Sequence, residues 1–125
     1  MPKRILVIDD EDDIREVAQL SLEMTTGWDV VSAASGAAGI EAARARRPDA
    51  ILLDVMMPEM DGPTTFQHLR ADAATAAIPV ILLTAKAQSS DRSRFMDLGV
   101  DGVLTKPFDP LTLGSEVAAA LDWKL

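Results

Sequence analysis

A short apolar run that ends on a carboxylate constrains this chain more than any other feature. Residues 51–53 are Ile-Leu-Leu, the next residue is Asp54, and Pro48 and Pro58 flank the segment. A run of this length between prolines is typical of a buried strand and is too short for a helix. A charge at the end of a buried strand costs solvation free energy unless other groups pair with it. The rest of the chain must therefore supply partners for Asp54.

The composition is that of one globular domain, and we expect residues 1–125 to form it. The sequence is 48% hydrophobic, and a chain of this length buries about two-thirds of its unfolded surface on folding. It contains no cysteine, which excludes disulfides and thiolate metal sites and fits the cytoplasm, where we expect the protein to act. No apolar run approaches membrane-spanning length, so we expect no membrane partner.

The formal charge of −8 argues against direct nucleic-acid binding, which requires a basic surface. Much of the acid lies in residues 9–13, Asp-Asp-Glu-Asp-Asp. For residues 11–13, the solvated start of a helix is an equally good interpretation, because acids favour the positive end of the helix dipole. Asp9 and Asp10 directly follow a strand, and for these two residues we favour a functional role.

The order of apolar runs and turn residues predicts an alternating α/β fold. We expect strands at 4–8, 28–33, 50–53, 80–83 and 100–105, and helices at about 12–25, 35–46, 64–71, 89–98 and 109–121. Strands that alternate with helices indicate a parallel sheet with helices on both faces. Right-handed crossovers place every strand-to-helix loop at the carboxyl edge of that sheet.

Capping residues mark several of the expected helix ends. Gly27 ends the first helix, and Ser35 begins the second. Ser89 or Ser90 begins the fourth helix, and Asp109 followed by proline begins the last. One stripe of the first helix, which includes Val17, and the phenylalanines and methionines are expected in the core.

Polar residues follow four of the five expected strands. Asp9 and Asp10 follow the first strand, Asp54 the third, Thr84 the fourth and Lys106 the fifth. Ligands of an open doubly wound sheet bind outside these strand ends. Three close carboxylates repel one another unless a cation joins them, and oxygen ligands without histidine or cysteine suit Mg²⁺ together with a phosphate. An aspartate can itself accept a phosphoryl group.

Together, four segments resemble the receiver (CheY-like) domain of two-component response regulators over essentially the whole chain. They are Asp9-Asp10, residues 54–62 (Asp-Val-Met-Met-Pro-Glu-Met-Asp-Gly), Leu83-Thr84-Ala85 and Lys106-Pro107-Phe108. Each segment alone is a weak signal, but their order and spacing together are specific. The resemblance implies a flavodoxin-like (βα)5 fold with a five-stranded parallel sheet in the order 2-1-3-4-5, which is the order of CheY itself.

The resemblance also implies roles for the residues at the carboxyl edge. Asp54 would accept a phosphoryl group from the phosphohistidine of a sensor histidine kinase or a histidine phosphotransfer protein. Lys106 would pair with a phosphoryl oxygen, and the Lys106–Pro107 peptide bond would be cis. The ligands of Mg²⁺ would be Asp9, Asp10, Asp54 and the backbone carbonyl of Met56.

A receiver of this kind is a switch, and the residues implied in its output are Thr84, Ala85, Lys86 and Val103. Thr84 would turn its hydroxyl towards the phosphoryl group. Relatives often carry Tyr or Phe where this chain has Val103, and a stiff β-branched side chain cannot report by ring rotation. Our hypothesis is that the loop after Thr84, including Lys86, carries the signal to a downstream partner or to an output domain absent from this chain.

Such a protein promotes its own phosphorylation and dephosphorylation and is not a turnover enzyme, but other functions stay open at this stage. A small Mg²⁺-dependent phosphatase with an aspartate nucleophile usually has a second acid two residues later, where this chain has Met56. A flavin or nucleotide carrier needs a Gly- or Thr-rich anion loop after the first strand, where the acids would repel phosphate. A receiver that only docks partners is a further alternative. A stand-alone regulator and a piece of a longer protein are both compatible with the sequence, as are a monomer and a phosphorylation-dependent dimer.

Overall fold

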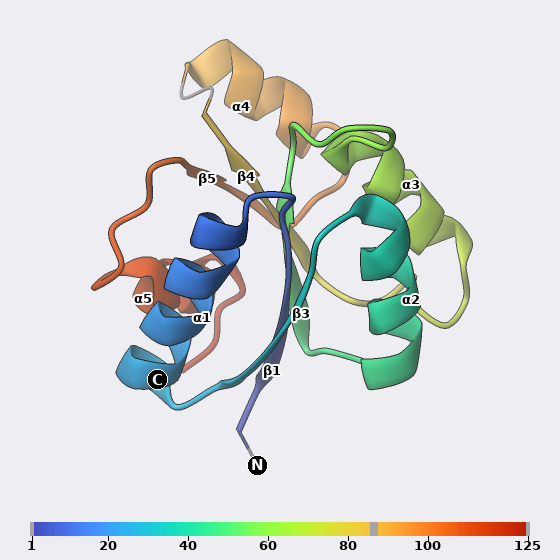
Figure 1. Ribbon diagram of the computed structural model, residues 1–125. Coiled ribbons are helices and arrows are strands. Elements are labelled where there is room, and N and C mark those ends of the chain that lie inside the picture. Colours follow the sequence, from blue (N-terminus) through green and yellow to red (C-terminus); the bar gives the residue numbers. More distant parts are fainter. Residues whose placement is uncertain (1, 86–87, 125) are drawn as a thin grey trace.

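A five-stranded parallel sheet lies between two layers of helices in the computed structural model, which describes residues 2–85 and 88–124 (Figure 1). The strands are β1 (Arg4–Ile8), β2 (Asp29–Ala33), β3 (Ala50–Asp54), β4 (Val80–Thr84) and β5 (Gly102–Thr105). The helices are α1 (Asp12–Thr26), α2 (Gly36–Arg46), α3 (Gly62–Ala71), α4 (Ser89–Met96) and α5 (Leu113–Ala120). The strand order β2-β1-β3-β4-β5 confirms the predicted (βα)5 fold.

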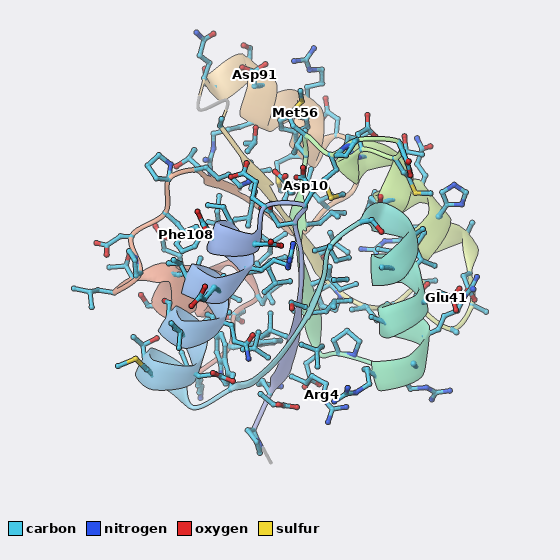
Figure 2. All side chains as sticks on the ribbon, viewed as in Figure 1. Arg4, Asp10, Glu41, Met56, Asp91 and Phe108 are labelled. Carbon is cyan, nitrogen blue, oxygen red and sulfur yellow. The ribbon has the colours of Figure 1, made fainter. Side chains whose placement is uncertain are left out.

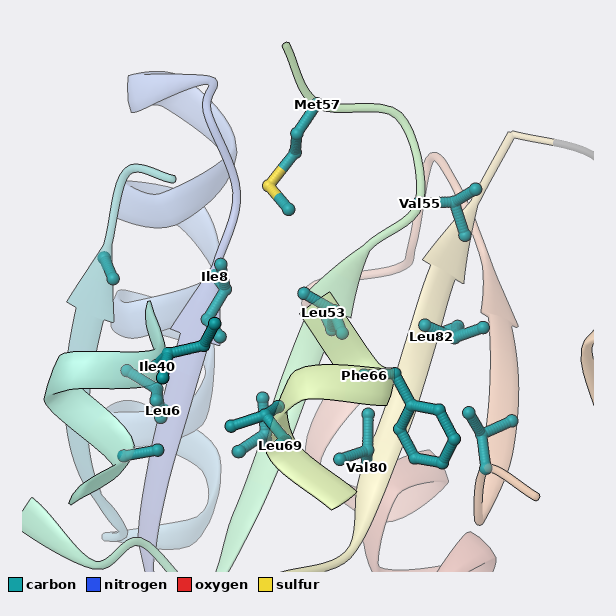
Figure 3. Packing of buried hydrophobic residues seen from close by; sticks show 14 of the residues in the cluster. Leu6, Ile8, Ile40, Leu53, Val55, Met57, Phe66, Leu69, Val80 and Leu82 are labelled. Carbon is teal, nitrogen blue, oxygen red and sulfur yellow. The ribbon is translucent and has the colours of Figure 1, made fainter. Parts of the chain in front are cut away.

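Side chains that alternate along each strand fill two hydrophobic cores, one on each face of the sheet. Leu6 and Ile8 of β1 pack towards α2 and α3, whereas Ile5 and Val7 pack towards α1 and α5. Figure 3 shows the first of these cores, with Phe66 of α3 beside strands β3 and β4. Because helices cover both faces, the inner strands are buried on both sides and appear in the sequence as continuous apolar runs.

The end of α1 and the start of α2 have the capping residues that the sequence predicts. Gly27 follows α1 with φ 76°, a left-handed conformation that glycine adopts without steric cost. The hydroxyl of Ser35 accepts a hydrogen bond from the backbone N–H of Ala38 and caps α2. The local sequence alone is therefore sufficient to place these two boundaries.

Helix α4 begins after Gln88 without a side-chain cap, so the predicted cap by Ser89 or Ser90 is wrong. Both serines lie within the first turn of the helix. The helix ends at Met96, two residues earlier than predicted. With Phe95 as its one buried residue, α4 has little apolar surface with which to extend its packing on the sheet.

Helix α5 begins at Leu113, so the predicted start at Asp109 and Pro110 is wrong. Asp109 instead begins a separate turn. Its carboxylate accepts a hydrogen bond from the N–H of Leu111, and its backbone carbonyl accepts one from the N–H of Thr112. An Asp-Pro pair starts a turn as readily as a helix. In this chain the turn precedes the helix in the sequence.

The predicted stripe of α1 is only partly buried. Its buried residues are Ala18, Ser21 and Leu22, whereas Val17 is 41% exposed. The prediction that methionines belong to the core is wrong for Met24, Met56 and Met96, which are exposed. Within the described residues, no helix is long and apolar enough to cross a membrane.

The loop between β3 and α3 returns closely across the end of β3. The N–H of Gly62 donates to the carbonyl of Val55 at 2.9 Å. A Cβ on Gly62 would lie 2.4 Å from the backbone oxygen of Asp54, and backbone atoms cannot move aside as a flexible side chain can. The absence of a side chain at Gly62 therefore allows the packing that holds Asp54 at the strand end.

We expect Gly62→Ala to lower the free energy of unfolding by about 1–3 kcal/mol, the usual cost of overpacking. Gly102→Ala is the matched control and should cost less, because its Cβ would meet only side-chain atoms, of which the nearest is the Cβ of Ala120 at 3.1 Å. Urea denaturation at 25 °C measures both variants. Equal stability of Gly62→Ala and the wild type would contradict the close approach.

Candidate functional site

The carboxyl edge of the sheet gathers acidic residues that are far apart in the sequence. Oxygen atoms of Asp9, Asp10 and Asp54 all lie within 4.8 Å of one another. Figure 2 shows Asp10 and Met56 at this end of the molecule and Arg4 at the opposite end of the sheet. Asp9 and Asp54 are buried, whereas Asp10 is exposed. The acidic cluster therefore has a buried floor and one side open to solvent.

Strand pairing places Asp9 beside Asp54. Ile8 of β1 is in register with Leu53 of β3, so the residues that follow them leave the sheet as neighbours. The N–H of Asp9 donates to the carbonyl of Ala33 at 3.1 Å, which continues the pairing with β2. Parallel register thus converts two distant sequence positions into one local cluster.

The side chain of Asp9 is held from two directions. Its Oδ1 accepts a hydrogen bond from the N–H of Glu11 at 2.9 Å. Its Oδ2 lies 2.7 Å from Nζ of Lys106 in an ion pair but accepts no hydrogen bond of good geometry. Burying a carboxylate is costly unless a charge pairs with it, and the ammonium group of Lys106 offsets part of that cost.

Lys106 joins the site from the end of β5. Its Nζ also lies 3.0 Å from Oδ1 of Asp54. The backbone N–H of Lys106 donates to the backbone carbonyl of Thr84 at 2.8 Å. Burial alone would lower the pKa of Lys106, but the contacts with Asp9 and Asp54 outweigh it and the pKa is raised. Lys106 therefore stays protonated. The Lys106–Pro107 peptide bond is cis, the isomer that the resemblance implies.

The charge of the cluster is not balanced by Lys106 alone. Burial raises the pKa of Asp54, and the charges of Asp9 and Asp10 raise it further, while the contact with Lys106 offsets only part of this. The cluster has three carboxylates, and the ammonium group of Lys106 contacts two of them, those of Asp9 and Asp54. The arrangement therefore favours the arrival of a further cation.

The residues present fit a hard divalent cation such as Mg²⁺. All of the clustered ligand atoms are carboxylate oxygens, the type that Mg²⁺ prefers. Asp9 and Asp54 form the buried side of the cluster, and exposed Asp10 leaves room for water ligands on the other side. Met56, the predicted carbonyl ligand, lies at the same edge in the loop after β3.

The predicted switch residues lie on the β4 side of this edge. Thr84 is buried at the end of β4, and Ala85 after it is exposed. Val103 is buried in the same core as Phe95 of α4. Lys86, which we predicted to carry the signal, lies outside the described residues.

A cavity of about 450 Å³ separates the end of β4 from α4. Its lining residues come from the β3–α3 loop, the start of α3, the end of β4 with the residue after it, and α4; they are Val55, Met56, Asp61, Pro63, Thr84, Ala85, Arg94 and Phe95. The cavity leaves space in which side chains beside the acidic cluster can rearrange.

The sequence reasoning did not identify Arg15 as a site residue. Its Nη1 donates to the backbone carbonyl of Asp9 at 2.7 Å, and its Nη2 pairs with Asp12. The available signal was its position, three residues after Asp12 and alone as a base in a strongly acidic segment. Every residue has a backbone carbonyl, however, so the sequence does not show which one an arginine contacts.

Comparisons with known proteins show the family of this chain. A sequence model of the family described as "Response regulator receiver domain" matches residues 5–118. The DNA-binding dual master transcriptional regulator RpaA of Synechocystis sp. is 45% identical over 94% of this chain. The alkaline phosphatase synthesis transcriptional regulatory protein PhoP of Bacillus subtilis is 39% identical over 97%. This chain covers 48% and 49% of those two proteins, about half of their length.

Solved structures show the same fold. A putative response regulator from Chloroflexus aurantiacus superposes with a TM-score of 0.87 at 32% identity, covering 98% of this chain and 99% of that one. The chemotaxis protein CheY4 of Vibrio cholerae also has a TM-score of 0.87, at 28% identity, with coverage of 96% and 99%.

Without Mg²⁺, we expect Asp54→Asn to be more stable than the wild type at pH 7. The carboxyl of Asp54 has a higher pKa in the folded protein than in the unfolded chain. The protonated carboxyl of Asp54 therefore adds to the free energy of unfolding. This contribution is complete below the ordinary pKa of about 3.9 and is lost as the pH rises through the pKa of the folded protein. Asparagine removes this loss, so the difference should grow from pH 4 to pH 7.

Urea denaturation in EDTA at several pH values measures this difference, with Asp97→Asn, at an exposed aspartate, as the control. A difference that does not depend on pH, or a less stable Asp54→Asn at pH 7, would contradict the stated charge imbalance.

Proposed function

The chain belongs to the response regulator receiver domain family of two-component systems, and we propose that Asp54 is its phosphoryl acceptor. The donor is the phosphohistidine of a sensor histidine kinase or a histidine phosphotransfer protein in the cytoplasm. The observation that carries this proposal is the buried carboxylate of Asp54, with Nζ of Lys106 at 3.0 Å and two further carboxylates beside it.

In the proposed transfer, a carboxylate oxygen of Asp54 forms a bond to phosphorus as the P–N bond to the donor imidazole breaks. The imidazole leaves with the bonding electron pair. Lys106 is placed to neutralise charge on a phosphoryl oxygen, since its Nζ already contacts the carboxylate that becomes the acyl phosphate. Phosphoryl transfer depends mainly on positioning and charge neutralisation, and both are supported by these contacts.

We propose that Asp9, Asp10 and Asp54, with the backbone carbonyl of Met56, hold Mg²⁺. When bound, Mg²⁺ supplies positive charge to the phosphoryl oxygens and offsets the repulsion among the carboxylates. Lys106 occupies one side of the cluster, and the exposed side at Asp10 is where the cation and the donor enter.

A receiver that promotes only its own phosphorylation and dephosphorylation fits the site better than a phosphatase does. The Met56 side chain is 72% exposed two residues after Asp54 and offers no base to activate water. The chain is thus proposed to promote its own phosphorylation and dephosphorylation without turnover of an external substrate. The complete set of acidic, hydroxyl and ammonium groups is more than a purely docking receiver would need.

The proposed switch must involve more than Thr84. A charged hydrogen bond contributes about 1.5–3 kcal/mol, whereas inverting a 1:99 population takes about 5.5 kcal/mol. The remainder has to come from Lys106, the metal and repacking around the cavity between β4 and α4. We propose that the output passes from this region to a downstream protein or a further domain, without direct nucleic-acid binding by these 125 residues.

We further propose that the histidine-bearing donor docks on an exposed apolar groove along α1. The groove, of about 220 Å³, lies between α1 and the segment after β5, and its residues are Val17, Leu20, Ser21, Met24, Thr25, Pro110 and Leu111. Leu20 is 50% and Leu111 81% exposed, and contiguous exposed apolar residues mark interaction sites. Both segments start at the acidic cluster, so a partner on the groove can reach Asp54.

Incubation with a small phosphodonor and Mg²⁺ should add one phosphoryl group to the wild type and none to Asp54→Ala. Intact-mass spectrometry measures the product, and EDTA should prevent it because the carboxylates then lack their cation. Phosphorylation of Asp54→Ala to the wild-type extent would exclude Asp54 as the acceptor.

Leu20→Glu should slow phosphoryl transfer from a phosphorylated histidine protein about tenfold, which corresponds to about 1.4 kcal/mol of binding. Transfer from a small phosphodonor should stay unchanged, since that donor does not need the groove. Met96→Glu, at a similarly exposed apolar residue of α4, is the control. Equal slowing with both donors, or with neither, would refute docking on the groove.

A further inference from the structure

Arg15 is unusual among the first residues of α1 because its side chain is mostly enclosed. It is the one basic residue in the stretch 9–16. Its side chain is 18% exposed, while that of its ion-pair partner Asp12 is 88% exposed. Ordering a long charged side chain in this way costs conformational entropy, so the contacts that Arg15 makes must be specific ones.

The guanidinium group of Arg15 bridges the loop and the helix. Nη1 donates to the backbone carbonyl of Asp9 at 2.7 Å, and Nη2 pairs with Oδ1 of Asp12. The planar fork of arginine suits two acceptors in fixed directions, whereas a lysine ammonium is a point charge. One side chain therefore links the end of β1 to the first turn of α1.

The contact with Asp9 adds a third hydrogen bond to a residue that lies between β1 and α1. The N–H of Asp9 donates to Ala33, and Oδ1 of Asp9 accepts from Glu11. Arg15 supplies the donor for the remaining carbonyl. That carbonyl belongs to the peptide unit between Asp9 and Asp10, so fixing it sets the directions in which both carboxylates leave the backbone.

Arg15 does this without occupying the ligand oxygens. Across residues 2–85 and 88–124, its ion pair is with Asp12 and not with a carboxylate of the acidic cluster. Lys106, in contrast, contacts both Asp9 and Asp54. The charge of Arg15 is also balanced by Asp12, which limits its repulsion of an arriving cation.

We propose that Arg15 is a positioning residue for the divalent-cation site. Its bridge between the Asp9 carbonyl and Asp12 holds the Asp9–Asp10 peptide so that both carboxylates face the cation. This inference rests on the proposed function of the acidic cluster as the Mg²⁺ site of a receiver.

Isothermal titration of Mg²⁺ into the full chain tests this role with Arg15→Met and Arg15→Lys. Positioning predicts that both variants raise the Kd about tenfold, at the lower end of the 10–100-fold effect of groups that orient metal ligands. Lysine should not rescue the affinity, because it keeps the charge but cannot span both acceptors. Arg44→Met, which also breaks an i,i+3 ion pair, should leave the Kd unchanged.

Other roles for Arg15 give different results. A purely electrostatic role predicts that Arg15→Met binds Mg²⁺ as tightly as the wild type or more tightly, and that Arg15→Lys matches the wild type. A purely structural role predicts a lower Tm without Mg²⁺ and an unchanged Kd. Either result overturns the proposal. If Arg15→Met does not fold, the Kd of Arg15→Lys decides alone.

The proposal can fail separately from the proposed function. A wild type that binds Mg²⁺ and accepts a phosphoryl group, with an unchanged Kd in both Arg15 variants, overturns the positioning role only. A wild type that binds no Mg²⁺ overturns the positioning role and the metal site together.

Discussion

Three carboxylates repel one another at one edge of the sheet, and both the contacts of Lys106 and the proposed cation site depend on this repulsion. The fold forces Asp9, Asp10 and Asp54 within 4.8 Å of one another, and a single protonated lysine lies among them. A chain stabilised only by packing would gain from replacing this cluster with apolar residues. The presence of the cluster at the carboxyl edge is what the binding of a cation and a phosphoryl group would require.

Much of this arrangement could be predicted from the sequence, because it follows from patterns that repeat locally. Continuous apolar runs predict the inner strands, and parallel register then brings Asp54 beside Asp9. The start of α5 could not be predicted, because Asp109 favours a turn and a helix about equally. The role of Arg15 was also missed, since its partner in the loop is a backbone carbonyl. Contacts of that kind depend on the folded path of the chain and not on residue type.

The β4 side of the site has a β-branched residue, Val103, where the resemblance led us to expect an aromatic one. Val103 is buried and stiff, while Phe95 of α4 lines a cavity of about 450 Å³ together with Thr84. Helix α4 buries Phe95 alone among its residues, so few apolar contacts oppose its movement. The physical path from Asp54 to a partner is therefore expected to cross this cavity and not to run through a rotating ring on β5.

A crystal structure grown with Mg²⁺ and beryllium fluoride, a mimic of the phosphoryl group, tests the central claim most directly. We expect a beryllium fluoride group on a carboxylate oxygen of Asp54, contacted by Lys106, with Mg²⁺ bound to the neighbouring aspartates. Crystals in which both ligands are absent from this edge, or in which Mg²⁺ binds elsewhere on the protein, would contradict it.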